Sequence, residues 1–286
     1  MLAYRHAFHA GNHADVLKHA TLVAVLQHMN LKDKGYRVVD THAGAGAYAL
    51  GGRHAQQRRE FDTGIARLWA RDDLPPLVQA YVEEVRAFNG DGGLRQYPGS
   101  PALAQQLMRA QDQLRLFELH ATDHGLLAGR MRADPRVEVK PADGFTVMKA
   151  QLPPPTRRGL VLIDPPYEIK SDYTRVLALL REVLERFAEC TVIIWLPQLQ
   201  LLDAAKLPQR LKAAATGVAP KGWLLARLSV AHPTDSARGF GMLGSLVFVA
   251  NPPHTLAPAL RKALPFLSAT LAENEAAAGW VCESSG

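Results

Sequence analysis

The chain has 286 residues, 48% of them hydrophobic, which is enough to bury the core of one large domain or of one domain that carries an insertion. No apolar run is long enough to cross a bilayer, and the first residues lack the apolar block of a secretory signal, so a soluble, cytoplasmic protein is expected. Two cysteines, Cys190 and Cys282, stand in unrelated contexts and suggest neither a disulfide framework nor a thiolate zinc site. The net charge of +6 fits a polyanionic partner without establishing one.

Residues 1–34 form an unusual opening segment, because five of the eleven histidines fall in its first 28 residues: His6, His9, His13, His19 and His28. His9 and His13 are four residues apart and could share a helix face, but there is no cysteine nearby and no HExxH motif, so no metal is expected. We expect the segment instead to line the mouth of a substrate site, with charges for phosphates and rings for base stacking, from Tyr4, Arg5, His6, His9, Lys18 and His19. An exposed polar helix is the alternative.

Short apolar runs alternate with helical stretches from about residue 35 onward, which is typical of a parallel sheet covered by helices on both faces. Five parallel strands are predicted at residues 36–41, 115–119, 136–139, 159–164 and 191–196. Two later runs, 223–231 and 245–251, have no helical crossover between them and predict an antiparallel hairpin. The expected fold is a mostly parallel α/β sheet of seven strands, with this hairpin at its edge.

The chain between the first two predicted strands is several times longer than one crossover helix needs. Its apolar residues recur with helical spacing and show little β character, which predicts a small helical subdomain inserted at residues 51–95 of a single domain. A helix is expected next, with Ser100 as its N-cap, Pro101 at its first position and its end near residue 109. The Ala-rich tail after Ala272 is expected to be poorly ordered.

Small and acidic residues follow the first three predicted strands, where doubly wound sheets hold their ligands. Asp40 and the glycine loop THAGAG after it would let a ligand approach the backbone, although a dinucleotide site would prefer GxGxxG leading directly into a helix. Glu118 is suited to accept hydrogen bonds from ribose hydroxyls, the alternative being a surface carboxylate. In Asp143-Gly144-Phe145, the carboxylate could accept from an adenine amine and the ring could pack on the base.

The sharpest motif is Asp164-Pro165-Pro166-Tyr167, directly after the apolar run GLVLI. The Asp164 carboxylate and the Pro165 carbonyl could hold an adenine amine, whose lone pair is delocalised into the ring, while Tyr167 could stack on a base removed from its helix. A plain strand-ending turn is the alternative. The order of the four strand-end motifs favours one pocket, and Asn251-Pro252-Pro253-His254, after an antiparallel run, is expected to be a structural turn.

The opening block YRHAFHAGNHADVLKH at residues 4–19, together with DTHAGAG at 40–46, YPGSP at 97–101, ADGF at 142–145 and DPPY at 164–167, resembles the bacterial large-subunit ribosomal RNA adenine-N6 methyltransferase family known as type J. The resemblance spans the whole chain. It implies a Rossmann-like class I methyltransferase fold with a helical insertion, acting as a monomer on one adenine of 23S rRNA, either naked or in an early assembly intermediate. It also implies S-adenosylmethionine as methyl donor, S-adenosylhomocysteine as product and no metal.

Matching positions of that family imply roles for individual residues. The cofactor contacts would be His19, His42, Ser100, Glu118, Asp143, Gly144 and Asp164. Asp164, Pro165 and Tyr167 would be the catalytic residues, with Asp164 accepting the amine proton, and Tyr4, His6 and Lys18 would contact or support the substrate. Two rivals remain open at this point: a DNA adenine-N6 methyltransferase, disfavoured because no helix-turn-helix or zinc finger is evident, and a non-catalytic RNA-binding or ribosome-assembly protein on the same scaffold.

Overall fold

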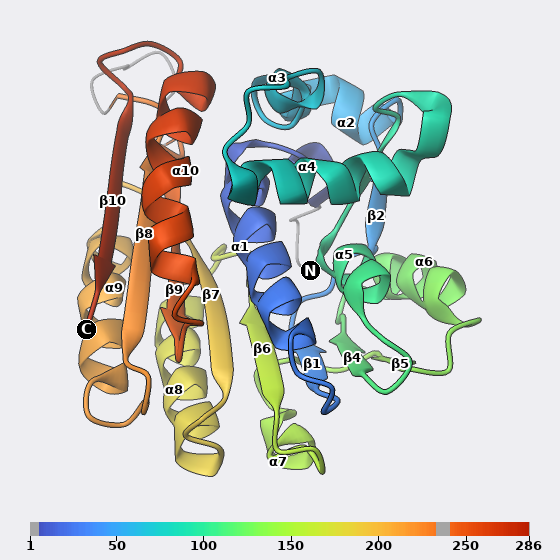
Figure 1. Cartoon of the computed structure of the whole chain (residues 1–286), viewed down its shortest axis with the longest axis vertical. Helices are drawn as coiled ribbons and strands as arrows, with labels where there is room; N and C mark the ends of the chain where they lie inside the picture. Colours follow the sequence, from blue (N-terminus) through green and yellow to red (C-terminus); the bar gives the residue numbers. More distant parts are fainter. Residues whose placement is uncertain (1–5, 233–240, 286) are drawn as a thin grey trace.

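The computed structural model describes residues 6–232 and 241–285 of the chain. Within them, eight strands form one sheet in the order β10-β8-β9-β7-β6-β1-β4-β5 (Figure 1). The strands are β1 (Arg37–Asp40), β4 (Gln113–Phe117), β5 (Val137–Lys140), β6 (Gly159–Ile163), β7 (Thr191–Gln198), β8 (Trp223–Ser229), β9 (Gly244–Ala250) and β10 (Gly279–Ser284). The neighbouring strands β7, β6, β1, β4 and β5 are parallel to one another. The strands β9, β8 and β10 pair antiparallel with their neighbours. The expected mostly parallel α/β sheet is confirmed, but it has eight strands where the sequence predicted seven.

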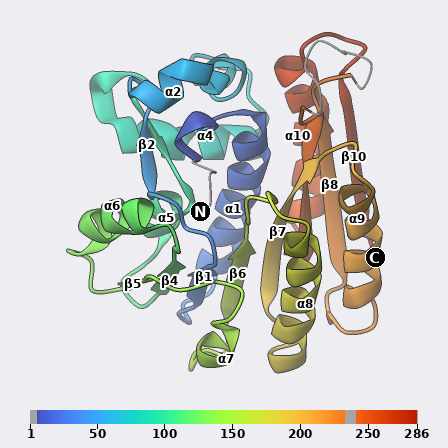
Figure 2. The same ribbon diagram turned by 180° about the vertical axis from the view of Figure 1, so that it is seen from behind.

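Helices cover both faces of the sheet, as Figures 1 and 2 show from opposite sides. One face carries α1 (His13–Asn30), α5 (Ser100–Leu107), α6 (Ala121–Met131) and α10 (Leu256–Leu271), and the other carries α7 (Met148–Gln151), α8 (Ser171–Arg186) and α9 (Leu202–Ala215). Alternate strand residues feed the two cores: in β7, Ile193 packs with the α1 side and Ile194 with the α8 side. Both faces of the sheet are therefore dry, which explains the nearly continuous apolar runs of its parallel strands.

The first long helix, α1, is buried on most of its circumference. A short 3-10 helix, η1 (His6–Phe8), precedes it, and Asn12 caps it by accepting from the backbone N–H groups of Ala14 and Asp15 at 3.0 Å each. Thirteen of its eighteen residues are buried, because α4, α5, α10 and β9 all pack against it. The alternative of an exposed polar helix is therefore wrong, and the polar side chains of Asp15, Lys18, His19 and Thr21 lie inside the protein.

The long connection from β1 to β4 is mainly helical. It contains β2 (Ala47–Ala49), α2 (Arg53–Arg58), α3 (Ala66–Trp69), α4 (Pro76–Asn89), β3 (Gln96–Pro98) and the 3-10 helices Glu60–Thr63 and Gly90–Gly92. A two-stranded antiparallel sheet of β2 and β3, in which Tyr48 pairs with Tyr97, lies just outside residues 51–95 and was not expected from the sequence. This small sheet joins the start and the end of the connection, so both ends arrive together beside β1.

The C-terminal part corrects two expectations. Residues after Ala272 are not a loose tail, because β10 pairs with β8 along its whole length, from Gly279 opposite Ser229 to Ser284 opposite Leu224. The β8-β9 hairpin consequently does not close the sheet edge, which β10 forms instead. Backbone pairing orders this segment even though its side chains are only partly buried.

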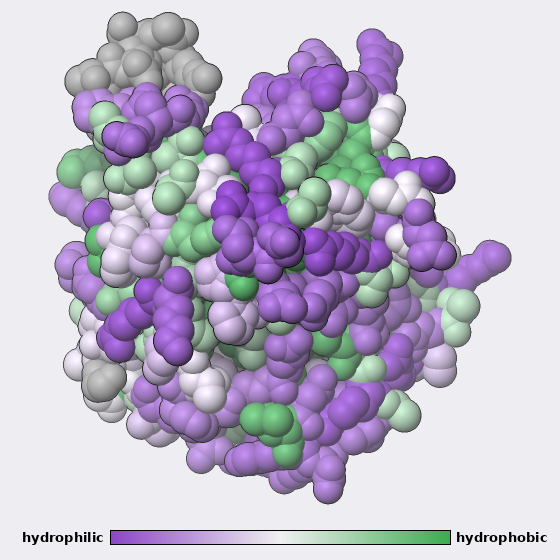
Figure 3. Space-filling view, turned by 45° about the horizontal axis from the view of Figure 1, so that its top comes forward, coloured by the Kyte–Doolittle hydropathy of each residue, from purple (hydrophilic) through white to green (hydrophobic). Residues whose placement is uncertain are grey.

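The face obtained by turning the top of Figure 1 forward is mostly hydrophilic, with hydrophobic side chains in separate areas (Figure 3). Among the described residues, no helix combines the length and the apolar character needed to cross a membrane.

Candidate active site

A cavity of about 330 Å³ opens at the carboxyl edge of the parallel strands. Its wall includes residues that follow β1, β4, β5 and β6, as the order of the sequence motifs predicted. Ten of the expected site residues line it: His6, Lys18, His19, His42, Ser100, Glu118, Asp143, Gly144, Asp164 and Pro165. The structure thus brings together, in one place, residues that are widely separated along the chain.

Glycines shape the floor of this cavity. Gly44, after β1, has a φ of +59°, a left-handed conformation that favours glycine. Gly144, after β5, lies so close to the Thr41 backbone that a Cβ atom would collide with the Thr41 carbonyl. A side chain at position 144 would therefore push apart the two loops that form the floor.

Glu118 lies directly after β4, and backbone groups fix its carboxylate. Its Oε2 accepts from the Gly44 N–H at 2.7 Å, and its Oε1 accepts from the His120 N–H at 2.7 Å. Burial raises its pKa, and the two backbone hydrogen bonds oppose that effect. Each oxygen has further lone pairs for a ligand in the cavity, which is how a carboxylate binds the two hydroxyls of a ribose.

The loop after β5 presents a carboxylate and an aromatic ring. Asp143 forms an ion pair with Arg175 of α8, whose guanidinium lies over the Phe145 ring at 4.1 Å from its centroid. His42 packs edge-on to Phe145, with 4.8 Å between ring centroids, and burial lowers the His42 pKa to about 4. His42 is consequently neutral at physiological pH and can offer one acceptor or one N–H to a ligand.

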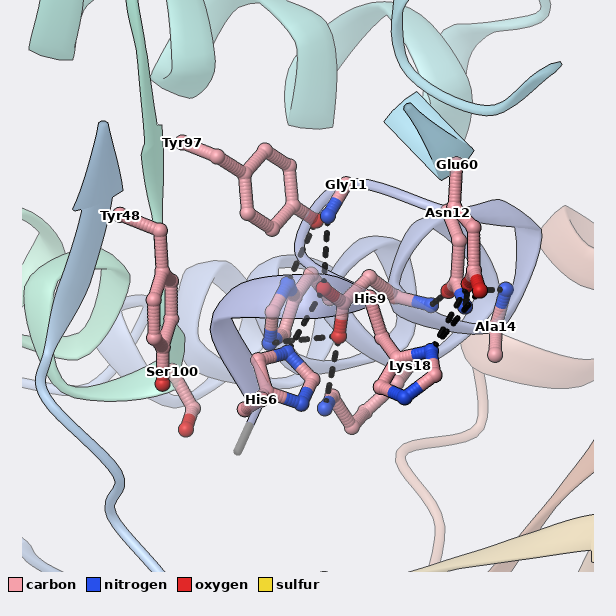
Figure 4. A network of polar contacts seen from close by, with 12 residues as sticks. His6, His9, Gly11, Asn12, Ala14, Lys18, Tyr48, Glu60, Tyr97 and Ser100 are labelled. Carbon is pink, nitrogen blue, oxygen red and sulfur yellow. Dashed lines mark hydrogen bonds and ion pairs between the residues drawn. The ribbon is translucent and has the colours of Figure 1, made fainter. Parts of the chain in front are cut away.

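A buried ion cluster joins α1 to the Asp-Pro-Pro-Tyr motif, and Figure 4 shows its His6 and Lys18 side chains. The Lys18 ammonium contacts Asp164 Oδ2 at 2.5 Å and Asp15 Oδ1 at 2.8 Å, and Asp15 Oδ2 also lies 2.9 Å from His6 Nε2. Although burial alone would lower the pKa of Lys18, the two carboxylates raise it well above its usual value. Lys18 therefore stays protonated, with its charge between two acids.

Asp15 is the centre of that cluster. Burial alone would raise its pKa, but His6 and Lys18 hold it well below the usual range. It also accepts a hydrogen bond from the Gly11 N–H at 2.9 Å. A carboxylate with this many partners fixes both the N-terminal loop and the Lys18 ammonium.

A chain of buried polar groups extends from α1 toward α4. His19 Nδ1 lies 2.7 Å from the Tyr97 hydroxyl, which lies 2.8 Å from the Tyr81 hydroxyl (Figure 4 shows the Tyr97 end). Burial lowers the His19 pKa well below its usual value, so this histidine is neutral. Its other nitrogen, Nε2, has no hydrogen-bond partner in the described structure and belongs to a residue of the cavity wall.

The sequence predicted Ser100 as the N-cap of its helix, and this prediction is wrong. Gly99 holds that position, α5 begins at Ser100 and ends at Leu107, earlier than expected, and Pro101 is its second residue. The Ser100 hydroxyl instead donates to Asp40 Oδ2 at 2.7 Å. Burial raises the Asp40 pKa to about 6, and the bond from Ser100 opposes this rise. This contact anchors the start of α5 to the end of β1.

A second cavity, of about 190 Å³, adjoins the first and shares His6, Lys18, Asp164 and Pro166 with it. Tyr167 lines this second cavity, with a φ of +53° that is unusual for a residue with a side chain. Its hydroxyl donates to the Trp195 carbonyl at 2.7 Å. The Asp-Pro-Pro-Tyr motif therefore forms the boundary between two cavities.

The remaining expectations for the opening segment have mixed outcomes. His9 and His13 do not share a helix face, because α1 begins at His13 and His9 lies in the preceding turn, where its Nδ1 contacts Glu60 at 2.9 Å. Within residues 6–232 and 241–285, no group of three or more His, Cys, Asp or Glu side chains could hold a metal. Tyr4 and Arg5 lie outside the described residues.

Asn251 confirms the structural role expected of its motif. Its amide donates to the carbonyls of Ala188 and Cys190 at 2.7 and 2.8 Å, at the end of the sheet opposite the cavities, where Ala250 pairs with Val192.

Three residues of the site were missed from the sequence: Asp15, Arg175 and Trp195. The spacing of Asp15 to Lys18 and His19, three and four residues, could have placed them on one helix face. No local signal marks Arg175 or Trp195, because each reaches the site only through tertiary packing.

Comparison with known proteins agrees with this geometry. Residues 33–282 match the family model described as ribosomal RNA large subunit methyltransferase D, RlmJ. The chain is 45% identical to ribosomal RNA large subunit methyltransferase J of Escherichia coli (strain K12), over 95% of this chain and 94% of that one. It is 42% identical to the protein of the same name from Haemophilus influenzae, over 99% and 98%.

A solved structure has the same fold. The crystal structure of protein LPL1258 from Legionella pneumophila superposes with a TM-score of 0.86 at 30% identity and covers 96% of this chain and 98% of its own. With the sequence matches above, this shows that the chain belongs to the ribosomal RNA large subunit methyltransferase J family.

Proposed function

We propose that the protein transfers a methyl group from S-adenosylmethionine to the exocyclic N6 amine of one adenine in 23S rRNA. The observation that carries this proposal is the position of Asp164, which lies on the wall of both cavities. One cavity suits the methyl donor and the other suits the acceptor base. The motif between them then stands where the transferred group must pass.

The first cavity has the residues that an adenosyl ligand needs. Glu118 offers acceptors for ribose hydroxyls, Gly44 and Gly144 allow close approach of the backbone, and Asp143 and Phe145 offer an acceptor and a ring for the adenine. The unpartnered Nε2 of His19 gives a further polar contact. When bound, this ligand supplies an electrophilic methyl group on a sulfonium centre.

The acceptor amine needs activation because its lone pair is delocalised into the purine ring. The Asp164 carboxylate and the Pro165 carbonyl accept hydrogen bonds from the amine and so favour localisation of that pair. After transfer the nitrogen carries an extra proton, which Asp164 accepts or relays. Lys18 stays protonated and holds the Asp164 carboxylate in place, so it does not compete for that proton.

We propose naked 23S rRNA, or an early assembly intermediate, as substrate and a monomer as the active species. The target base would be splayed out of its helix into the second cavity, as enzymes that act on a base require. The family relationship supports RNA over DNA as the polymer.

Transfer of a labelled methyl group from S-adenosylmethionine to unmodified 23S RNA tests the proposal, with nucleoside mass analysis of the product. We expect N6-methyladenosine from the wild type and none from Asp164→Ala. Calorimetry with S-adenosylhomocysteine should give saturable binding for both proteins, which separates loss of chemistry from loss of fold. Transfer to DNA alone, or saturable binding without transfer to RNA or ribosomal particles, would contradict it.

A further inference from the structure

The second cavity contains a hydrogen-bond donor that the mechanism above does not use. Trp195 lies on β7, next to the strand that leads into the Asp-Pro-Pro-Tyr motif, and its side chain lines the cavity. Two contacts hold it there: its carbonyl accepts from the Tyr167 hydroxyl at 2.7 Å, and the two rings lie 5.9 Å apart between centroids. The position of Trp195 is thereby fixed relative to Asp164.

The indole N–H of Trp195 is buried and has no hydrogen-bond partner in the described structure. Among the described residues that line either cavity, only His19 and Trp195 have a buried side-chain atom in this state. An unpaired buried donor destabilises the fold, so a well-packed protein rarely keeps one without a use for it. His19 is one of the residues that line the cavity assigned to the donor, whereas Trp195 is one of those that line the cavity assigned to the base.

The chemistry of adenine complements such a donor. Its N6 amine donates, and the ring nitrogens on either side, N1 and N7, accept. Asp164 and Pro165 supply the acceptors for the amine, so a donor beside them would satisfy one flanking ring nitrogen. Guanine has the opposite pattern on its Watson–Crick edge, because its O6 accepts and its N1 donates, but its N7 accepts as that of adenine does. A bond to N1 would therefore distinguish adenine from guanine, whereas a bond to N7 would distinguish purines from pyrimidines.

We propose that the Trp195 indole N–H donates a hydrogen bond to N1 or N7 of the acceptor adenine and is a specificity-determining residue of this enzyme. The inference rests on the proposed function, since it needs an adenine in the second cavity. It assigns to Trp195 a role in recognising the base, separate from the role of Asp164 at the amine. Asp164 holds the reacting atom, and Trp195 reads the ring beside it.

A substitution cycle tests the proposal. The proteins are the wild type and Trp195→Phe, which keeps an aromatic ring without the N–H. The substrates are 23S RNA fragments with adenosine, 1-deazaadenosine or 7-deazaadenosine at the acceptor position, each deaza base lacking one ring acceptor. Methyl transfer is measured as kcat/KM.

We expect one of the two deaza substrates to lower kcat/KM of the wild type about tenfold or more, which identifies the nitrogen that is read. Trp195→Phe should lower kcat/KM for adenosine RNA by a similar factor, and that same deaza substitution should cause little further loss in the variant, because the two changes remove one shared bond. Equal losses for the deaza substrate in both proteins, or full activity of Trp195→Phe, would overturn the inference.

Trp223→Phe is the matched control. In the wild type, the Trp223 indole N–H donates to the Thr216 hydroxyl at 3.1 Å, and Trp223 lines neither cavity. The kcat/KM of Trp223→Phe should therefore equal that of the wild type. Calorimetry with S-adenosylhomocysteine confirms that both variants keep a folded donor site. Failure of the proposed function would appear separately, as absence of transfer to adenosine RNA by the wild type.

Discussion

The Lys18 ammonium lies 2.5 Å from the Asp164 carboxylate and links the first long helix to a motif that follows the fourth parallel strand. The same ammonium contacts the buried Asp15, so one buried cation separates two acids. Removing it would leave those acids facing each other without compensation. We therefore expect this link to contribute to the stability of the fold as well as to the proposed catalysis.

Lys18→Met should both inactivate and destabilise the protein. Breaking a buried ion pair typically costs about 3–5 kcal/mol, because the remaining partner is left charged and unpaired. Urea unfolding measures the stability, and methyl transfer measures the activity. Lys262→Met, at an exposed position of α10, is the control and should change neither. Stability of Lys18→Met within about 0.5 kcal/mol of the wild type would contradict the assigned role of the cluster.

Glu118→Ala should weaken binding of S-adenosylhomocysteine about tenfold or more, since it removes a charged acceptor from the cavity together with its bonds to the Gly44 and His120 backbone. Glu118→Gln keeps one carbonyl acceptor and should bind with intermediate affinity. Calorimetry measures both. Glu185→Ala, exposed on α8, should bind like the wild type. If Glu118→Ala binds S-adenosylhomocysteine as tightly as the wild type does, the Glu118 carboxylate is not part of the donor site.

Asp40 predicts a pH-dependent difference in stability between two proteins. Burial raises the pKa of Asp40 to about 6 in the folded chain, against the usual 3.8 of an aspartate, so the folded chain holds a proton that the unfolded chain releases between those values. Rising pH from about 4 to 6 therefore costs the wild type stability at this residue, up to about 3 kcal/mol.

Asp40→Asn lacks this titration. The free energy of unfolding of the variant minus that of the wild type should accordingly increase from pH 4 to pH 7 and then become constant. Urea unfolding at successive pH values gives the difference directly, and groups common to both proteins cancel. A difference that stays flat across this range would show that Asp40 titrates normally.

Gly144→Ala should damage the donor site, because its Cβ would collide with the Thr41 carbonyl and separate the two floor loops. We expect affinity for S-adenosylhomocysteine to fall at least tenfold and stability to fall by about 1–3 kcal/mol. Gly125→Ala on α6 is the control, since nothing lies within 4 Å of its added Cβ. That change should leave binding intact and stabilise the helix by up to about 1 kcal/mol. If the two variants behave alike, the close approach at Gly144 is unimportant.

The sequence predicted the parallel strands and the residues at their ends because both follow from local pattern. An apolar run predicts where a buried strand ends, and parallel strands bring their carboxyl ends together, which placed Glu118 and Asp164 on one pocket. The same reasoning could not find β10, since its order comes from backbone pairing with β8 and its side chains remain partly exposed.

The burial of α1 was also beyond local pattern. Polar residues such as Asp15, Lys18 and His19 indicate a surface helix when each is judged alone. They are buried because Asp15 and Lys18 pair with each other and His19 pairs with the Tyr97 hydroxyl. The role of Trp195 also could not be predicted from local pattern. An aromatic residue in an apolar strand predicts core packing, and only the three-dimensional arrangement places it in a cavity wall.

The surroundings of α1 have a consequence for the order in which the molecule is assembled. This helix is made early, but it packs against β9 and α10, and α10 begins only at Leu256. During synthesis the apolar surface of α1 stays exposed or loosely covered until β9 and α10 can pack on it, when almost the whole chain has left the ribosome. The contact of Lys18 with Asp164 depends on that docking, so a nascent chain that lacks α10 should hold no working site and should be prone to aggregate.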